Sequence, residues 1–359
     1  MTVLTVEAAH PYQVHIGPGA LSAFQEICSG LLASADKIAI LADEQVARLH
    51  LEYLRSHLAK TGHIYIKQIP AGESAKSIET YMDCQSFLLE NEFSRNSLLL
   101  AFGGGAAGDL AGFVASTFMR GIPFIQIPTT ILAHDSAVGG KTAINHAAGK
   151  NMIGTFYQPA AVIYDTHLLK TLPEKEIRSG MAEVIKHAFI SNEGWLEELL
   201  SVEDIYGLTD EEMAKHLERG IAVKAAIVEE DEFENGVRKF LNFGHTLAHA
   251  IEAVLGYGKI THGEAVAIGM AYALELSGHQ KLAPYLKWCQ SNGYPLQTLV
   301  DLPFEQLENY MKKDKKTSGG LLKFVMLKEI GLPFVDTVDH NKAQAAYDVL
   351  CSKIGEMQL

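Results

Sequence analysis

The sequence lacks the features that define several large protein classes. No apolar run among its 359 residues approaches the ~20 needed to span a bilayer. The first residues, MTVLTVEAAHPYQ, have neither the basic start nor the long apolar stretch of a signal peptide. Positive charge is scarce, and the net charge of −13 argues against nucleic acid or an anionic membrane as a main partner. We therefore expect a cytoplasmic protein, for which a small anionic substrate is still allowed.

Cysteine is also rare. The four cysteines lie far apart and form no C-x-x-C pair: Cys28, Cys84, Cys289 and Cys351. This spacing suggests neither a disulfide framework nor a thiolate metal site. We expect reduced, buried thiols.

What the sequence does contain divides into two parts. Short apolar runs typical of strands occur at 37–41, 63–66, 97–102, 124–128 and 161–165, and helical patterns such as 44–60 and 77–92 separate several of them. This alternation predicts a parallel sheet covered on both faces. After about residue 175 helical periodicity dominates. We predict an α/β domain over residues 1–174 and a mainly α-helical domain over residues 175–359.

A glycine cluster follows one predicted strand and opens a helix. Gly103, Gly105 and Gly108 satisfy G-x-G-x-x-G, which suits a pyrophosphate at a helix N-terminus, although a tight strand-to-helix turn is the alternative. The acid expected about 20 residues later is missing. Asp43, at the end of an earlier strand, is a candidate to meet a ribose instead.

Two further stretches carry polar groups beside predicted strands. AGESAKS contains Glu73 and Lys76, and the threonines of PTT (128–130) either bind a cofactor or cap the next helix. Residues 134–154 are dense in Asp, Gly, Lys, His and Asn, which suits a phosphate or polyol, whereas the alternative is a solvated loop. Arg120 lies between a helix and a strand and is placed to reach an anion in its own or a neighbouring subunit.

The second half holds a set of titratable side chains in apolar surroundings. His245 and His249 share one face of a predicted helix, and His262 opens the next helix. A carboxylate added to two of these histidines would make a Zn²⁺ site with positions open for substrate. Spacing does not decide which two histidines take part, nor whether the acid is Glu183 or Glu264. Buried, hydrogen-bonded polar residues are the alternative.

Taken together, these motifs resemble the 3-dehydroquinate synthase family from about residue 10 to the C-terminus. The matching segments are GGGAAGDLAGF, RGIPFIQIPTT, DSAVGGKTAIN, GKNMIGTFYQP, SGMAEVIKHA, LNFGHTLAHAIE and HGEAVAIGM. The resemblance implies an N-terminal Rossmann-like domain, a helical C-terminal domain, bound NAD, a divalent metal (Zn²⁺ or Co²⁺) and a homodimer.

The resemblance also assigns roles to individual residues. The metal ligands would be Glu183, His245 and His262, and His249 would transfer a proton. Other residues match substrate-site positions: Asp135, Lys141, Asn151, Lys186, Lys224, Arg238 and Asn242. Arg120 resembles an arginine that reaches the partner subunit's phosphate site, and Lys316 is preferred over Lys315 and Lys323 as a phosphate-binding lysine. The NAD contacts would be Asp43, Glu73, Lys76, Gly103, Gly104, Gly105, Asp109, Thr129, Thr130, Lys141, Lys150 and Thr171.

The implied reaction converts 3-deoxy-D-arabino-heptulosonate 7-phosphate to 3-dehydroquinate and phosphate, a step of the shikimate pathway. NAD would accept and later return a hydride, so there is no net redox change. The alternatives are another NAD- and metal-dependent sugar-phosphate cyclase, a polyol dehydrogenase that consumes NAD, or a non-catalytic NAD-binding module. The lysine and arginine set, Arg238 above all, favours the dehydroquinate reaction over these alternatives.

Overall fold

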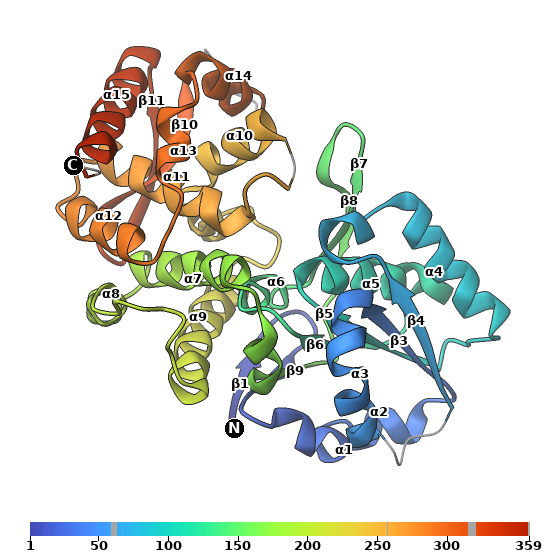
Figure 1. The fold of residues 1–359 in the computed structure, drawn as a ribbon. Helices are drawn as coiled ribbons and strands as arrows, with labels where there is room; N and C mark the ends of the chain where they lie inside the picture. The colour runs from blue at the N-terminus through green and yellow to red at the C-terminus, as the bar shows by residue number, and fades with distance from the viewer. Residues whose placement is uncertain (59–62, 257, 315–320, 358–359) are drawn as a thin grey trace. The chain divides into compact units, whose positions relative to one another are not determined.

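The chain forms two compact units. The computed structural model describes residues 1–58, 63–256, 258–314 and 321–357 (Figure 1). The first unit comprises Met1–Leu172 and Thr209–Phe233, and the second comprises Pro173–Leu208 and Glu234–Leu359. The long helix α9 (Asp210–Glu230) therefore groups with the first unit, because it packs against the first two strands. The expected helical domain over 175–359 differs from the structure in this segment.

A seven-stranded sheet forms the centre of the first unit, in the order β1-β2-β9-β6-β5-β3-β4. All neighbours are parallel except β1 and β2. All five strands predicted from apolar runs belong to this sheet. The strands are β1 (Thr2–Val6), β2 (Tyr12–Gly17), β3 (Ile38–Asp43), β4 (Ile64–Ile69), β5 (Leu98–Gly103), β6 (Phe124–Pro128) and β9 (Ala161–Asp165).

Helices cover both faces of this sheet, as the continuous apolar strands predict. On β3, Ala39 and Leu41 join the core under α4 and α5, whereas Ile38 and Ile40 join the core under α1 and α3. The helices of this unit, besides α9, are η1 (Ala20–Ala23), α1 (Phe24–Ile27), α2 (Ser29–Ser34), α3 (Glu44–Leu58), η2 (Gly72–Ala75), α4 (Ile78–Glu90), α5 (Gly105–Thr117), η3 (Phe118–Arg120), α6 (Ala133–Ser136) and η4 (Thr166–Thr171).

The glycine- and lysine-rich stretch 134–154 is not a loop. Most of it forms the antiparallel hairpin β7 (Lys141–His146) and β8 (Gly149–Phe156), drawn in green in Figure 1. Most of β8 is exposed, so its residues carry no apolar alternation that would predict a half-buried strand.

The second unit is built mainly of helices around α11. Residues around the whole circumference of α11 are buried, and it packs against α7, α10, α12 and α15. The helices are α7 (Glu174–Phe189), α8 (Glu193–Leu200), η5 (Val237–Asn242), α10 (His245–Leu255), α11 (His262–Leu276), α12 (Leu282–Ser291), α13 (Gln297–Val300), α14 (Phe304–Asp314) and α15 (His340–Glu356). Among the described residues, no helix is both long enough and apolar enough to cross a membrane.

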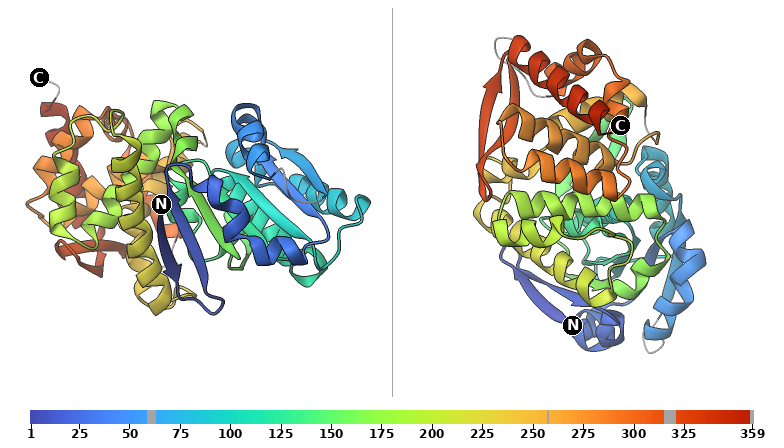
Figure 2. Two further views of the ribbon diagram at one scale, coloured as in Figure 1. Left: turned by 90° about the horizontal axis from the view of Figure 1, so that it is seen from below. Right: turned by 60° about the vertical axis from the view of Figure 1, so that its left-hand side comes forward.

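The second unit also contains a hairpin that helical periodicity does not predict. Strands β10 (Leu322–Glu329) and β11 (Leu332–Val338) pair antiparallel. In the right-hand view of Figure 2 these red strands run alongside the orange helices, and β10 contacts α11.

Candidate functional site

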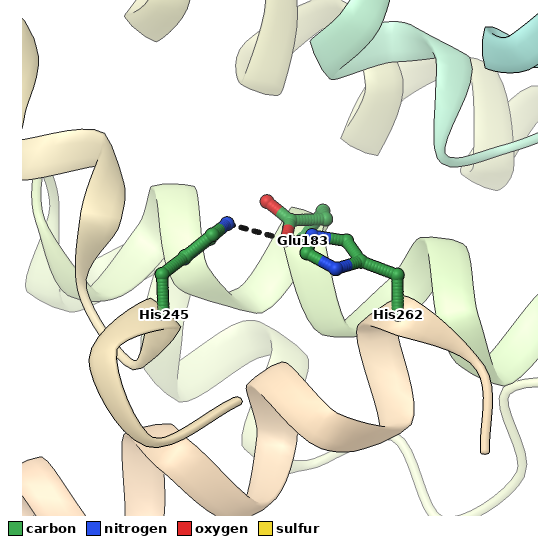
Figure 3. Close-up of side chains that lie close together, drawn as sticks. All are labelled: Glu183, His245 and His262. Carbon is green, nitrogen blue, oxygen red and sulfur yellow. Dashed lines mark ion pairs between the residues drawn. The ribbon is translucent and has the colours of Figure 1, made fainter. Parts of the chain in front are cut away.

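The second unit brings Glu183, His245 and His262 together from three helices. Glu183 lies in α7, and the two histidines are the first residues of α10 and α11. His245 Nε2 is 3.6 Å and His262 Nε2 is 3.7 Å from Glu183 Oε1 (Figure 3). One ligand atom from each residue lies within 4.8 Å of the others. The three side chains thus enclose one point that a cation could occupy.

Local backbone geometry at Gly244 positions His245 near this point. Gly244 precedes α10 with a φ of 84°, in the left-handed region that favours glycine. A Cβ at this position would lie 2.7 Å from Met270 Cγ of α11, so only glycine fits without a shift. The close approach of Gly244 to α11 places the first turn of α10 beside that helix.

The electrostatics of the three residues suit a divalent metal. Glu183 is 1% exposed, and within the described chain neither of its carboxylate oxygens has a hydrogen-bond partner, although Lys186 forms an ion pair with it. Burying a carboxylate is costly unless a cation meets it. The Lys186 ammonium meets Glu183 at Oε2, and Oε1 faces the two imidazoles. Burial and the neighbouring charge of Lys186 hold the pKa of His245 well below its usual value, so its ring is neutral, as a metal ligand must be. One oxygen and two nitrogen donors form a set that zinc accepts.

Glu252 supports His262 from the other side of its ring. His262 Nδ1 lies 3.2 Å from Glu252 Oε2, which leaves Nε2 directed toward Glu183. Burial alone would lower the pKa of His262, but the hydrogen bond and charge of Glu252 outweigh it and raise the pKa. The negative charge of Glu252 likewise favours a metal cation bound to the His262 ring. The sequence reasoning assigned no role to Glu252, and its position ten residues before His262 gives no helical signal linking them.

The contacts of the alternative residues bear on the choice that spacing left open. Glu264 is engaged elsewhere: Arg178 binds it at 2.8 and 3.0 Å, and it caps the start of α11. The ring of His249 lies 5.5 Å from that of His245 and 6.1 Å from that of His262. His249, Glu252 and His262 form a second group with metal-ligand spacing. We favour the Glu183 group, because Glu183 Oε1 lies 3.6 and 3.7 Å from the Nε2 atoms of both histidines, whereas Glu252 already contacts His262 through Nδ1.

In the first unit, several of the predicted cofactor residues lie around the start of α5. Gly103 ends β5 and Asp43 ends the neighbouring strand β3, at the point where the chain turns from one half of the sheet to the other. Ligands of open parallel sheets bind beside such carboxyl ends. A Cβ at Gly103 would lie 2.6 Å from Ala107 Cβ, and one at Gly104 would lie 2.9 Å from Thr130 Cγ2. A side chain at either position would therefore clash where the helix begins.

Two buried hydroxyls face the same loop. Thr129 Oγ1 and Ser136 Oγ have no hydrogen-bond partner within the described residues. A Cβ at Gly105 would lie 2.7 Å from Ser136 Oγ, so this hydroxyl lies at the helix N-terminus. Sequence reasoning named Thr129 but not Ser136, whose only signal was its place beside Asp135. Asp43 is engaged by backbone amides, at 2.9 Å from Gln45 and 2.9 Å from Gly72.

Lys76 connects three segments of the first unit. It is 3% exposed, its Nζ lies 2.6 Å from Asp109 Oδ2, and it donates a hydrogen bond to the side chain of Asn151 in β8. Glu73 lies 3.9 Å from Lys76 and accepts a hydrogen bond of 2.7 Å from Asn145. Burial raises the pKa of Asp109, and the positive charge of Lys76 opposes that shift. Four predicted residues from η2, α5 and the hairpin are thus in one cluster.

Other predicted residues of the first unit lie in smaller groups. Lys224 of α9 lies 3.1 Å from Asp135 Oδ2 of α6. His50 Nε2 lies 2.7 Å from Thr171 Oγ1. Lys141 is the first residue of β7 and is exposed, and Lys150 is the second residue of β8. Arg120 is exposed and has a φ of 69°.

The remaining predicted residues belong to the second unit. Lys186 lies one turn after Glu183 and is 1% exposed, as is Arg238 in η5. Asn242 Nδ2 donates a hydrogen bond of 3.2 Å to Glu234 Oε1. Lys315 and Lys316 lie outside the described residues, and Lys323 is exposed on β10.

Comparisons with known proteins agree with this arrangement. The family model for the 3-dehydroquinate synthase N-terminal domain matches residues 66–179, and the C-terminal model matches residues 180–317. The 3-dehydroquinate synthase of Lysinibacillus sphaericus is 51% identical over 345 residues, which cover 94% of each chain.

Two solved structures share the fold over nearly the whole chain. A 2-deoxy-scyllo-inosose synthase complexed with carbaglucose-6-phosphate, NAD⁺ and Co²⁺ has a TM-score of 0.84 at 25% identity, covering 96% of this chain and 99% of that one. A 2-epi-5-epi-valiolone synthase from Streptomyces hygroscopicus with NAD⁺ and Zn²⁺ bound has a TM-score of 0.83 at 25% identity, covering 95% and 97%. From the family models and the 51% identity, the chain belongs to the 3-dehydroquinate synthase family.

Proposed function

We propose that this chain converts 3-deoxy-D-arabino-heptulosonate 7-phosphate to 3-dehydroquinate and phosphate, as a carbon–oxygen lyase of the shikimate pathway that leads to aromatic amino acids. The observation that carries the proposal is the buried Glu183 carboxylate beside His245 and His262, in a chain that belongs to this family. Both the donor set and the glycine loop fit the groups bound in the solved neighbours, NAD⁺ with Co²⁺ or Zn²⁺.

Each unit has its own part in this proposal. The first unit binds NAD at the β5–α5 loop, with Asp43, Thr129, Thr130 and the Lys76–Asp109 pair around it, and Glu73, Lys150 and Thr171 further out. The second unit holds Zn²⁺ or Co²⁺ through Glu183, His245 and His262. When bound, the metal supplies a Lewis acid for a substrate hydroxyl and NAD supplies a reversible hydride acceptor.

The charged residues hold the substrate and move its protons. Arg238 presents a guanidinium fork that binds a carboxylate through two hydrogen bonds. Lys141, Lys186, Lys224 and Lys316 supply positive charge for the phosphate and hydroxyls, and Asp135, Asn151 and Asn242 orient the hydroxyls. His249 receives the proton that leaves the substrate hydroxyl. Fixing the chain of the substrate in this way favours the final ring closure, because the reacting carbons are held near each other.

We further propose that the protein acts as a homodimer in the cytoplasm. Arg120 and Met119 both have positive φ values, 69° and 49°, and both are exposed. Backbone strain of this kind persists where it serves a function, here the presentation of Arg120 to a partner's phosphate site. The four free cysteines suit a reducing compartment.

In a mixture of Arg120→Ala and His245→Ala subunits, activity should return, because a mixed dimer contains one complete site. No regain would place Arg120 in its own subunit's site or exclude the dimer.

The reaction is tested by incubating the purified protein with the heptulosonate phosphate and a trace of NAD. We expect phosphate and 3-dehydroquinate in equal amounts, no accumulation of NADH, and loss of both products with a chelator or in His245→Ala. Release of phosphate without the dehydroquinate ring would indicate another cyclase. Steady NADH production from a simple polyol would indicate a dehydrogenase, and either result would overturn the proposal.

A further inference from the structure

Arg178 and Glu264 form an ion pair beside the proposed metal centre, and neither residue is a metal ligand in it. Arg178 lies in α7, five residues before Glu183, and Glu264 lies in α11, two residues after His262. Arg178 Nε and Nη2 donate to Glu264 Oε1 at 3.0 and 2.8 Å. The pair therefore links the helix that carries the carboxylate ligand to the helix that carries a histidine ligand.

Glu264 uses its other oxygen to fix the start of α11. Its Oε2 accepts the Thr261 backbone N–H at 3.0 Å, and the Thr261 hydroxyl accepts the Glu264 N–H at 3.3 Å, which is a capping box. His262 is the residue directly after this N-cap. One carboxylate thus holds both the helix start and the neighbouring helix.

The residue between His262 and Glu264 is in direct contact with α7. The Gly263 N–H donates to Ser179 Oγ at 3.1 Å, and a Cβ at Gly263 would lie 1.8 Å from the Ser179 carbonyl oxygen. Ser179 is one turn before Glu183 on α7, so the two share a face. The backbone that carries His262 cannot move away from α7 without breaking these contacts.

Arg178 is itself held in place. Its Nη1 donates to the Tyr206 hydroxyl at 2.9 Å, and the Tyr294 hydroxyl donates to its backbone carbonyl at 2.8 Å. The Tyr206 hydroxyl in turn donates to the Asn292 carbonyl at 2.9 Å. Arg178 is thus held at both its backbone and its guanidinium, which makes it suitable for positioning a carboxylate.

We propose that the Arg178–Glu264 pair is a positioning device for the metal centre, which sets the separation of His262 and Glu183 and so tunes metal affinity. This inference rests on the proposed function, in which His262 and Glu183 share one ion. Residues outside the ligand set that orient ligands commonly alter metal affinity by about 10- to 100-fold when they are replaced.

The test compares Glu264→Gln with Glu275→Gln on metal-stripped protein. Glutamine keeps the capping box but loses the charge that pairs with Arg178. Glu275 lies near the opposite end of α11 and pairs with Lys353 at 2.7 Å, so its variant loses an ion pair of the same helix far from the site. Co²⁺ affinity is measured by chelator competition, the Co²⁺ coordination by visible absorption, and the folded state by thermal unfolding without metal.

We expect Glu264→Gln to bind Co²⁺ about 10- to 100-fold more weakly with an altered absorption spectrum, and Glu275→Gln to bind it as the unaltered protein does. The double variant Arg178→Gln/Glu264→Gln should be no weaker than either single variant, because both remove one interaction. Unchanged affinity in Glu264→Gln, or an equal loss in Glu275→Gln, would overturn the inference while leaving the metal centre intact. If His245→Ala bound Co²⁺ as tightly as the unaltered protein does, both this inference and the proposed metal centre would be overturned.

Discussion

Glu252 and His262 form a carboxylate–histidine pair across 3.2 Å, with the imidazole nitrogen opposite that contact directed at Glu183. A carboxylate behind a ligand histidine fixes its tautomer and ring orientation and increases its basicity. The structure therefore supplies both the ligands of the proposed metal centre and the group that orients one of them.

The first prediction concerns this pair. Glu252→Gln should weaken metal binding by about 10- to 100-fold, because the amide neither carries the charge nor fixes the ring as strongly. Chelator competition with Zn²⁺ measures the change. Glu329→Gln, an exposed glutamate at the end of β10, is the control. Equal Zn²⁺ affinity in Glu252→Gln and the unaltered protein would contradict the account.

The second prediction concerns recognition of the substrate carboxylate. Arg238→Lys keeps the positive charge but loses the two-pronged fork, so KM for the heptulosonate phosphate should rise roughly 10- to 100-fold, as expected for losing a charged hydrogen bond worth about 1.5–3 kcal/mol. The neighbouring Lys239 is exposed, and Lys239→Ala should leave KM unchanged. An unchanged KM in Arg238→Lys, measured by phosphate release, would remove Arg238 from the substrate site.

The third prediction concerns the glycine loop. Gly104→Ala should weaken NAD binding by about tenfold or more, because the new Cβ would lie 2.9 Å from Thr130 Cγ2 and overpacking of this kind costs about 1–3 kcal/mol. Gly30→Ala in α2, where a Cβ meets nothing within 4 Å, should bind NAD normally. Isothermal titration calorimetry gives both affinities. Tight NAD binding by Gly104→Ala would place the cofactor elsewhere.

The fourth prediction concerns the ion pair between buried Lys76 and Asp109, whose side chain is 20% exposed. Lys76→Met leaves the Asp109 carboxylate without its cation and should lower the free energy of unfolding by about 3 kcal/mol. Lys67→Met, which breaks an ion pair between partly exposed Lys67 and Asp83, should cost less than about 1 kcal/mol. Urea unfolding measures both. Similar losses of unfolding free energy in the two variants would show that the Lys76–Asp109 pair stabilises the fold no more than a partly exposed ion pair does.

The same variant has a predicted pH dependence. The pKa of Asp109 is raised by burial, and removing Lys76 raises it further. A carboxyl with a raised folded-state pKa binds more protons folded than unfolded, so stability decreases as pH rises through that range. Lys76→Met should therefore recover part of its lost stability on acidification from neutral pH toward the ordinary aspartate pKa, more than Lys67→Met does. A parallel response of the two variants would contradict this assignment.

The fifth prediction concerns the thiols. Burial raises the pKa of both Cys28 and Cys84 to about 12, and Cys289 is fully buried with a raised pKa, so almost no thiolate exists at neutral pH. In the native protein, a thiol reagent such as dithionitrobenzoate should react with no cysteine other than Cys351. In denaturant it should react with all four cysteines. Rapid native reaction of a second thiol would show that the core around it opens.

Much of the fold was predictable because apolar periodicity reports burial. The five strands and the long helices follow from it directly, as β3 and β5 illustrate: each is buried along its whole length and reads as a continuous apolar run. Elements with other surroundings gave no such signal. Most of β8 is exposed, and β11 has only one buried residue, Val338, so neither strand carries a buried apolar run. The grouping of α9 with the first unit depends on tertiary packing, which a helical pattern does not contain.

For the site, too, the sequence indicates candidate residues but not their tertiary partners. The family resemblance implied Glu183, His245 and His262 as ligands, whereas spacing alone could not choose between Glu183 and Glu264. The partners of the two carboxylates favour Glu183: Glu264 is occupied by Arg178 and the N-cap of α11, whereas Glu183 faces two imidazoles. Glu252 and Ser136 were missed because their roles depend on neighbours distant in sequence or on a single buried hydroxyl.

The location of the metal is the central claim, and anomalous diffraction from a crystal soaked in Co²⁺ tests it most directly. The account predicts one strong peak in contact with Glu183 Oε1, His245 Nε2 and His262 Nε2. A peak held instead by His249, Glu252 and His262, another group with ligand spacing, would contradict it and reverse the roles of His245 and His249.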